Sequence, residues 1–183
     1  MDRRVIRTKK AIRSAFLTLM IDKDIDRITI KELAEKADVD RKTVYNYYAS
    51  VYDILGEIEN ELVQNFESEA FTLKDAKNPR AYFEAIARLI NRDMELYELL
   101  MRSNNSNFVN KLVVFLRDWI QTALNQGGMF DREKIAIAAE YVTAGIYCAY
   151  RHWFYSERKK SLEEFSLELC DLVMSGLPGY FIG

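Results

Sequence analysis

Apolar side chains recur at three- and four-residue spacings in one segment after another, and this helical period constrains the fold more than any other feature. In the first segment Val5, Ile6, Ile12, Phe16 and Leu19 share one helix face. The same pattern occupies residues 50–73, 78–101, 108–124, 131–155 and 162–174. Only two prolines and seven glycines interrupt the 183 residues, whereas all-β chains need many turn residues. The sequence therefore predicts an all-α fold.

Charge divides the chain into two parts. Residues 1–50 carry 12 Lys/Arg and 8 Asp/Glu, for a net charge of +4, and the remainder carries 14 and 20, for −6. Six of the basic residues and one acid fall within residues 1–13. A basic end on an acidic body is typical of a nucleic-acid-binding module joined to a second domain. A solvated basic tail explains the charge pattern equally well, so other features must decide.

Composition argues against several other classes of protein. Every stretch of about 18 residues contains charge, so no transmembrane helix is predicted, and no apolar segment of a secretory signal follows the basic N-terminus. Cys148, Cys170 and the lone His152 are too few for a disulfide framework or a zinc site. We expect a cytoplasmic protein without metal, cofactor or membrane partner, in which both cysteines are small buried apolar side chains.

Catalysis is not predicted either. The sequence shows no nucleophile–base pair, no metal-ligand cluster and no phosphate-binding loop, and His152 is its only histidine. We therefore expect no catalytic residues and interpret the chain as a binding protein.

A short helix, a tight turn and a second short helix are predicted after the first polar break. Thr29 followed three residues later by Glu32 is a capping box, in which each side chain bonds an unpaired backbone N–H. Asp38 suits the turn because Asp tolerates left-handed backbone, and Asp40 is expected to cap the second helix. That helix is predicted from Arg41 to Tyr48. The arrangement is that of a helix-turn-helix.

The outward side chains of this second helix suit DNA. Arg and Lys reach phosphates or guanine edges, Asn pairs with adenine, and Thr contacts a thymine methyl group. An ordinary helical hairpin with a polar face is the alternative, but Tyr45, Tyr47 and Tyr48 argue against it, since exposed aromatic clusters usually have a partner. The residues that we expect to contact DNA are Thr29, Lys31, Arg41, Lys42, Thr43, Tyr45, Asn46 and Tyr47.

The segments RTKKAIRSAFLTLM and ITIKELAEKADVDRKTVYNYYASVYDIL resemble the TetR family of bacterial transcriptional regulators, over about residues 4–66. The resemblance implies that residues 1–50 form a three-helix DNA-binding domain with Arg41 to Tyr48 as recognition helix. It further implies a linking helix over residues 50–73 and a C-terminal bundle over residues 74–183 that binds an effector and forms the dimer.

The sequence departs from the family pattern at four positions. Asp38 replaces the usual turn glycine, Asp40 the usual serine that opens the recognition helix, and Tyr48 the usual phenylalanine. Val51 replaces the usual lysine, so one customary phosphate contact is missing. We expect the mode of DNA binding to be retained.

Residues 74–183 contain no motif of comparable specificity, although the segments 143–153 and 161–165 look like one class of TetR-type C-terminal domains. Aromatic and methionine side chains there can line an effector pocket or simply form the core, and the core is the commoner role of such residues. The candidate pocket residues are Tyr82, Phe83, Ile86, Tyr97, Met101, Phe115, Trp119 and Tyr147.

In the helix predicted at 131–155, several side chains recur at spacings of three and four residues and so form a stripe along one face. With the helix at 162–174 it can form a four-helix dimer interface, and the small Gly145 permits close approach; an intramolecular core is the alternative. Two-fold DNA sites favour the dimer. The candidate interface residues are Tyr141, Gly145, Cys148, His152, Phe165 and Leu169.

The sequence thus predicts a homodimeric regulator that binds a palindromic double-stranded DNA operator. We expect a repressor that an unknown small-molecule effector releases from DNA. The alternative is a TetR-like co-regulator that a protein partner controls in place of a metabolite.

Overall fold

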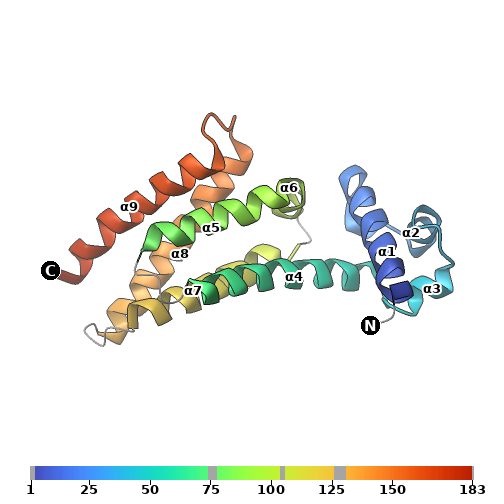
Figure 1. Cartoon of the computed structure of the whole chain (residues 1–183), viewed down its shortest axis with the longest axis horizontal. Coiled ribbons are helices and arrows are strands. Elements are labelled where there is room, and N and C mark those ends of the chain that lie inside the picture. The colour runs from blue at the N-terminus through green and yellow to red at the C-terminus, as the bar shows by residue number, and fades with distance from the viewer. Residues whose placement is uncertain (1–2, 74–77, 104–105, 126–130, 183) are drawn as a thin grey trace. The chain divides into compact units, whose positions relative to one another are not determined.

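The computed structural model of the chain describes residues 3–73, 78–103, 106–125 and 131–182, with side chains as far as Gly176. Every regular element in these ranges is a helix, which confirms the predicted all-α fold (Figure 1). The elements are α1 Arg3–Asp22, the 3₁₀ turn η1 Ile25–Arg27, α2 Ile30–Lys36, α3 Arg41–Tyr45, α4 Val51–Thr72, α5 Pro79–Arg92, α6 Met94–Arg102, α7 Phe108–Asn125, α8 Arg132–Tyr155 and α9 Leu162–Ile182. None of these helices is both long and apolar enough to cross a membrane.

The chain divides into two compact units. The first unit contains Met1–Glu61 together with Arg102–Asn107, and the second contains Leu62–Met101 together with Phe108–Gly183. The division falls inside α4, at Glu61, whereas the sequence placed the end of the N-terminal domain at residue 50. It also assigns the segment between α6 and α7 to the first unit.

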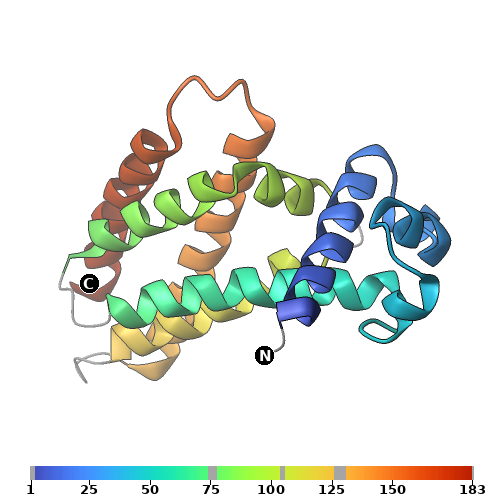
Figure 2. The same cartoon turned by 45° about the vertical axis from the view of Figure 1, so that its right-hand side comes forward.

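In the first unit α1 packs on α2 and α2 packs on α3 (Figure 2). The fully buried side chains of Ile12, Phe16, Leu33 and Val44 form the core between these helices. The capping box at the start of α2 is confirmed: the N–H of Glu32 donates to Thr29 Oγ1 over 3.2 Å, and the N–H of Thr29 donates to the Glu32 carboxylate over 3.2 Å.

The turn between α2 and α3 uses left-handed backbone. Asp38 has φ of 54°, as expected of a turn residue that replaces glycine. Asp40 lies at the N-cap of α3, but its side chain makes no capping hydrogen bond, so the expected cap is wrong. The recognition helix is also shorter than predicted. The N–H groups of Tyr47 and Tyr48 both donate to Val44 O, and this turn directs Tyr48 into the core.

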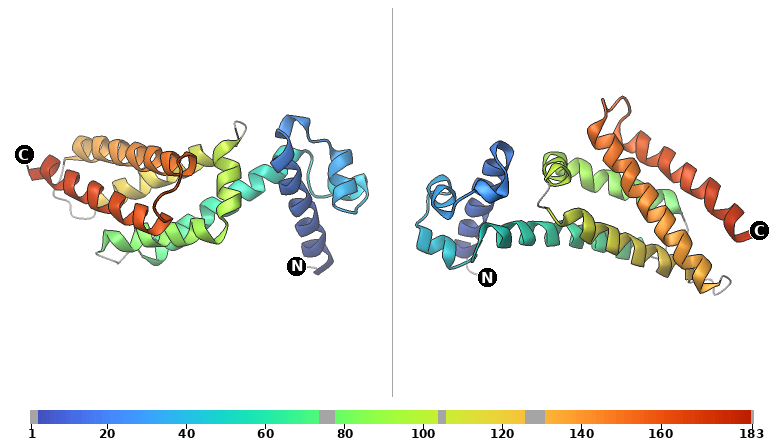
Figure 3. Two further views of the ribbon diagram at one scale, coloured as in Figure 1. Left: turned by 90° about the horizontal axis from the view of Figure 1, so that it is seen from above. Right: turned by 180° about the vertical axis from the view of Figure 1, so that it is seen from behind.

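In the second unit α5 packs on α9, α7 on α8, and α8 on α9. Figure 3 shows α8 and α9 as an antiparallel pair in orange and red. The predicted start at Asn78-Pro79 is confirmed, because Asn78 Oδ1 accepts from the Arg80 N–H over 3.1 Å and proline opens α5.

The single helix predicted over residues 78–101 is wrong. Asp93 leaves the helical region at φ −139°, so α5 ends at Arg92. A second helix, α6, then begins, and the N–H groups of Leu96 and Tyr97 donate to Asp93 O. Neither proline nor glycine marks the break. The new helix direction allows Tyr97 and Leu100 to be buried.

Candidate functional site

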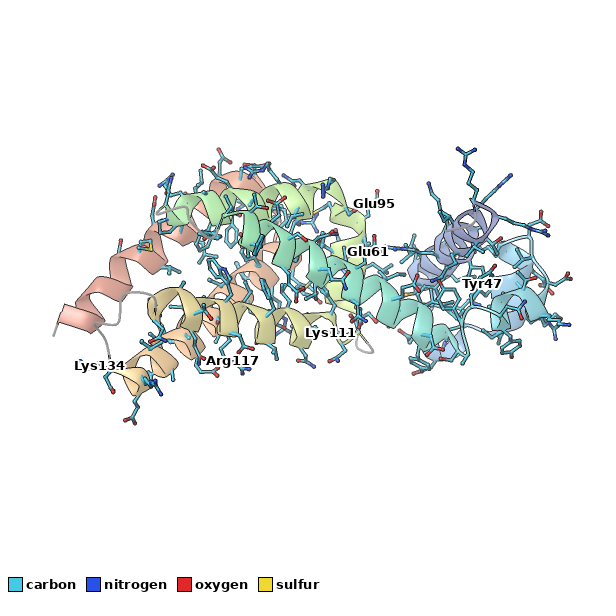
Figure 4. The ribbon with its side chains drawn as sticks, turned by 60° about the horizontal axis from the view of Figure 1, so that its bottom comes forward. Tyr47, Glu61, Glu95, Lys111, Arg117 and Lys134 are labelled. Atoms are coloured by element: carbon cyan, nitrogen blue, oxygen red, sulfur yellow. The ribbon has the colours of Figure 1, made fainter. Side chains whose placement is uncertain are left out.

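The surface of α3 and the turn after it carries most of the predicted DNA-contacting residues. Arg41, Lys42, Tyr45 and Asn46 are exposed, and Thr43 and Tyr47 are half-buried. Tyr45 is 57% exposed. Tyr47 lies on the turn after α3 (Figure 4). The surface therefore offers two cations, one amide and two phenols on a short rigid element.

Two further predicted residues lie at the start of α2. Thr29 is exposed, but its hydroxyl already takes part in the capping box. Lys31 is exposed, with its Nζ 3.9 Å from the Glu35 carboxylate one turn along the helix. Val51, which replaces the family's usual lysine, is buried in the first unit. A side chain packed in the core cannot make the phosphate contact of that lysine.

Glu57 on α4 holds Tyr48, which follows the turn after α3. Its carboxylate accepts from the Tyr48 hydroxyl over 3.1 Å and pairs with Lys9 of α1 at 2.5 Å. The Lys9 ammonium also lies 5.2 Å from the centre of the Tyr48 ring. Burial, followed by the nearby charge of Glu57, raises the pKa of Tyr48 well above that of an ordinary phenol.

The basic residues of α1 divide into two groups, which the sequence did not distinguish. Lys9 and Arg13 form ion pairs with Glu57 and Glu61, one turn apart on both α1 and α4. These pairs tie α1 across the first turns of α4. The other four, Arg3, Arg4, Arg7 and Lys10, are exposed, and Arg3, Arg7 and Lys10 are spaced so that they share one face of α1. These exposed cations are the ones that a phosphate backbone can reach without breaking the ion pairs of Lys9 and Arg13.

A buried acid that sequence reasoning missed holds the segment between α6 and α7. Glu59 is 2% exposed, and its Oε1 accepts from Ser106 Oγ over 2.9 Å and from the Asn107 N–H over 2.7 Å. A signal was available, because Glu59 shares the helix face of the apolar Leu55 and Leu62. An acid at such a position needs buried donors.

Two small cavities lie inside the second unit, and seven of the eight candidate pocket residues line them. The first, here called the Trp119 cavity, has a volume of about 30 Å³. The second, here called the Tyr97 cavity, has about 50 Å³. Tyr82, Ile86, Phe115 and Trp119 line the first; Ile86, Tyr97, Met101 and Tyr147 line the second. Phe83 is buried and lines neither cavity.

One face of α8 is exposed on the chain and includes four of the six candidate interface residues. Tyr141 is 79% exposed, and Gly145, Cys148 and His152 are exposed along the same face. A Cβ atom added to Gly145 meets nothing within 4 Å, so this glycine serves no packing need inside the chain.

The other two candidate interface residues are covered within the chain. Leu169 is buried, and the half-buried Phe165 ring lies 5.4 Å from that of Tyr150. The cysteines also differ from expectation: Cys170 is buried as predicted, but Cys148 is exposed, so its predicted burial is wrong. Helical spacing correctly predicted that these residues of α8 share one face. It did not predict whether that face is exposed or packed in the core.

No group of three metal-binding side chains occurs among the residues that the structure describes. Within the same residues the Tyr150 hydroxyl contacts Ser166 Oγ at 2.8 Å in the core, and burial raises the pKa of Tyr150. The hydroxyl pair joins α8 to α9, and Tyr150 also lines the Tyr97 cavity.

Comparisons with known proteins agree with this arrangement. A family model described as "Bacterial regulatory proteins, tetR family" matches residues 12–58, and one described as "Transcriptional regulator C-terminal region" matches residues 77–175. The uncharacterised HTH-type transcriptional regulator YxbF of Bacillus subtilis is 34% identical over 89 residues, which are 44% of this chain. The chain spans only 23% of the length of that relative.

Solved structures share the fold over nearly the whole chain. NalD, the secondary repressor of the MexAB-OprM multidrug efflux pump in Pseudomonas aeruginosa, superposes with a TM-score of 0.74 at 16% identity, covering 94% of this chain and 97% of NalD. The regulator FadR from Bacillus subtilis, in complex with stearoyl-CoA, gives 0.68 at 18% identity, covering 91% and 98%. Such low identities show the fold alone. The family models cover more than half of the sequence, and the chain belongs to the TetR family of bacterial transcriptional regulators.

Proposed function

We propose that this regulator is a repressor that binds a palindromic DNA operator as a homodimer and leaves it when a small molecule occupies the second unit. The exposed surface of α3 carries the proposal. Its cations, amide and phenols have the chemistry of base-edge and phosphate contacts, while Val44 and Tyr48 anchor the helix in the core.

The exposed face of α8 supports the homodimer. Ile137 and Tyr141 are large apolar side chains that the chain leaves uncovered, and Gly145, one turn further along the same face, allows a second helix to approach closely. A second copy related by a two-fold axis buries the same face on both copies. Two-fold DNA-binding proteins place their recognition helices in successive major grooves, about 34–36 Å apart, and we propose the same arrangement for this dimer.

The two cavities support an effector site in the second unit. At about 30 and 50 Å³ they are far below the roughly 300–1,000 Å³ of pockets that hold drug-sized ligands. A ligand must therefore open them, and opening is a change of state that can couple to DNA binding. The regulator FadR was solved with stearoyl-CoA, an effector-sized ligand, in the same fold. A tenfold loss of DNA affinity requires about 1.4 kcal/mol of coupling.

The same small volumes favour a second candidate function, in which a protein partner controls the regulator. A partner that binds an exposed helix face needs no internal pocket. The two candidates differ in the size of the molecule that releases DNA, and an experiment can separate them on that basis.

The test begins with the purified full-length chain and fragmented bacterial DNA. Fragments retained by the protein are sequenced, and binding to the recovered site is compared with binding to a shuffled site by fluorescence anisotropy. A two-fold sequence bound at least about a thousandfold more tightly than the shuffled one agrees with the proposal. Equal binding to both contradicts sequence-specific regulation.

The releasing agent is then sought in a cell extract divided by ultrafiltration. Loss of DNA binding caused by the low-molecular-weight filtrate agrees with a small-molecule effector. Loss caused only by the retained, protease-sensitive fraction agrees with the protein-partner alternative and contradicts the effector.

A further inference from the structure

The side chains that line the two cavities are almost all uncharged, although the protein as a whole is rich in charged residues. Of the described residues that line them, Glu69 of α4 is the only one that carries a charge, and it lines the Trp119 cavity. Its carboxylate is half-buried and forms no hydrogen bond or ion pair with the described residues. A carboxylate at a cavity wall, without a partner among these residues, can pair with a cation that enters the cavity.

Aromatic rings stand beside this acid. The rings of Tyr82 and Trp119 pack on each other, with centres 4.3 Å apart at 60°, and both line the Trp119 cavity. The Tyr82 hydroxyl donates to Leu73 O, which fixes that ring in place. Trp and Tyr faces attract cations, and proteins recognise quaternary ammonium groups with aromatic side chains.

The Tyr97 cavity has a different chemistry. Its walls are apolar and aromatic, and Tyr97 packs edge-on against Phe66 with ring centres 6.0 Å apart. Phe66, Ile86 and Leu116 line both cavities, so these three side chains form the partition between them. Ile86 and Leu116 are only half-buried. A ligand that occupies both cavities must displace these shared side chains.

An anionic ligand finds no partner in this space. Neither cavity has Lys, Arg or His among the described residues that line it. The cations of α7 nearest in sequence, Lys111 and Arg117, lie along the outer edge of that helix (Figure 4), and Arg117 pairs with Glu140 at 3.4 Å. A carboxylate or phosphate placed here loses its water without compensation.

We propose that the effector of this regulator is an amphiphilic cation, with its ammonium-type head beside Glu69 and the Tyr82–Trp119 pair and its hydrocarbon tail in the Tyr97 cavity. This inference rests on the proposed function only in treating these cavities as the effector site. It names the class of ligand from the acid at the cavity wall, the aromatic pair and the apolar extension.

The test compares three probes of equal chain length at neutral pH, the two ionic probes below their micelle concentrations and the alcohol below its solubility limit. Isothermal titration calorimetry measures the binding of decyltrimethylammonium, 1-decanol and decanoate to the full-length chain. The cation should bind at least about tenfold more tightly than 1-decanol and decanoate. Decanoate binding as well as the cation, or no binding of the cation, overturns the inference.

Variants assign the effect to the named residues. Glu69→Gln should weaken the cation about tenfold and leave 1-decanol unchanged. Trp119→Leu keeps an apolar wall but removes the aromatic face, and should also weaken only the cation. Glu67→Gln removes an exposed acid on the same helix that lines neither cavity, and should change nothing. Urea unfolding of each variant verifies its fold, and unchanged cation affinity in both Glu69→Gln and Trp119→Leu overturns the inference.

The proposed function is tested separately by repeating the operator titration with saturating decyltrimethylammonium. Cation binding without loss of DNA affinity contradicts effector-controlled release but leaves the assignment of the ligand class intact. If the chain binds its operator but no cation binds in the calorimeter, the assigned ligand class is contradicted and the proposed DNA-binding function is not.

Discussion

The buried carboxylate of Glu59 accepts a hydrogen bond from the backbone N–H of Asn107 over 2.7 Å, just before α7 begins. The same oxygen accepts from Ser106 Oγ, so one side chain of α4 satisfies two donors from a segment 47 and 48 residues away. A carboxylate also interacts favourably with the N-terminus of a helix. This contact explains why Arg102–Asn107 belongs to the first unit although α6 and α7 mostly belong to the second.

Glu59→Ala should destabilise the chain by about 1–3 kcal/mol, because the Ser106 and Asn107 donors would then be without their buried acceptor. Glu61→Ala is the matched control on the same helix: its ion pair with Arg13 is exposed, so its removal should cost less than about 1 kcal/mol. Urea unfolding measures both. Equal losses in the two variants would show that the Glu59 contact is no stronger than a surface pair.

Alkaline pH should expose the role of Tyr48. Burial and then Glu57 raise the pKa of its phenol in the folded chain above the ordinary value of 10.0. A raised folded pKa gives stability that is present below about pH 10 and is lost as the pH rises through the folded pKa.

Tyr48→Phe removes this titration, and at neutral pH it costs about 1 kcal/mol because the hydrogen bond to Glu57 is absent. Its stability should fall less steeply than that of the wild type above pH 10, measured by urea unfolding across the pH range. Parallel curves for the two proteins would mean that the Tyr48 phenol is not perturbed.

The two groups of cations on α1 should respond differently to removal. Arg7→Ala and Lys10→Ala should each lower operator affinity and reduce the salt slope of binding by about one unit, as expected when one phosphate contact is removed. Lys9→Ala should instead act mainly on stability, because Lys9 pairs with Glu57. Operator titrations at several salt concentrations separate the two groups, and an unchanged slope in both Arg7→Ala and Lys10→Ala would exclude this face from DNA.

Gly145 offers a clean test of the dimer face. A side chain at this position meets nothing within the chain, so Gly145→Trp should leave the fold intact by circular dichroism. It should wedge a partner helix away and give monomers by sedimentation, while Gly145→Ala stays dimeric. A dimeric Gly145→Trp that still binds a palindromic site would move the interface away from this part of α8.

Local features of the fold followed from the sequence because their causes are local. The capping box of Thr29 and Glu32, the left-handed Asp38 and the start of α5 at Asn78 each depend on residues a few positions apart. The break at Asp93 has no local breaker residue. It reflects tertiary burial of the next turn, which a helical period alone does not reveal.

The candidate site was predictable to the same extent. The exposed residues of α3 follow from the period of one helix packed on another. The partners of the α1 cations could not be predicted, because Lys9 and Glu57 lie 48 residues apart and meet only in the folded unit. Likewise, the spacing of Cys148 placed it on the stripe of α8 but left open whether that stripe is covered within the chain.

Contact of α3 with DNA is tested most directly by operator titrations of the wild type, Lys42→Ala and Asn46→Ala by fluorescence anisotropy. Lys42 and Asn46 are exposed, so both variants should keep the stability of the wild type. If Lys42 binds a phosphate, Lys42→Ala should weaken binding to all DNA sequences alike. If Asn46 reads a base edge, Asn46→Ala should cost about 1–3 kcal/mol at one operator position. Wild-type affinity, salt slope and sequence preference in both variants would contradict the assignment of α3 as the DNA-reading element.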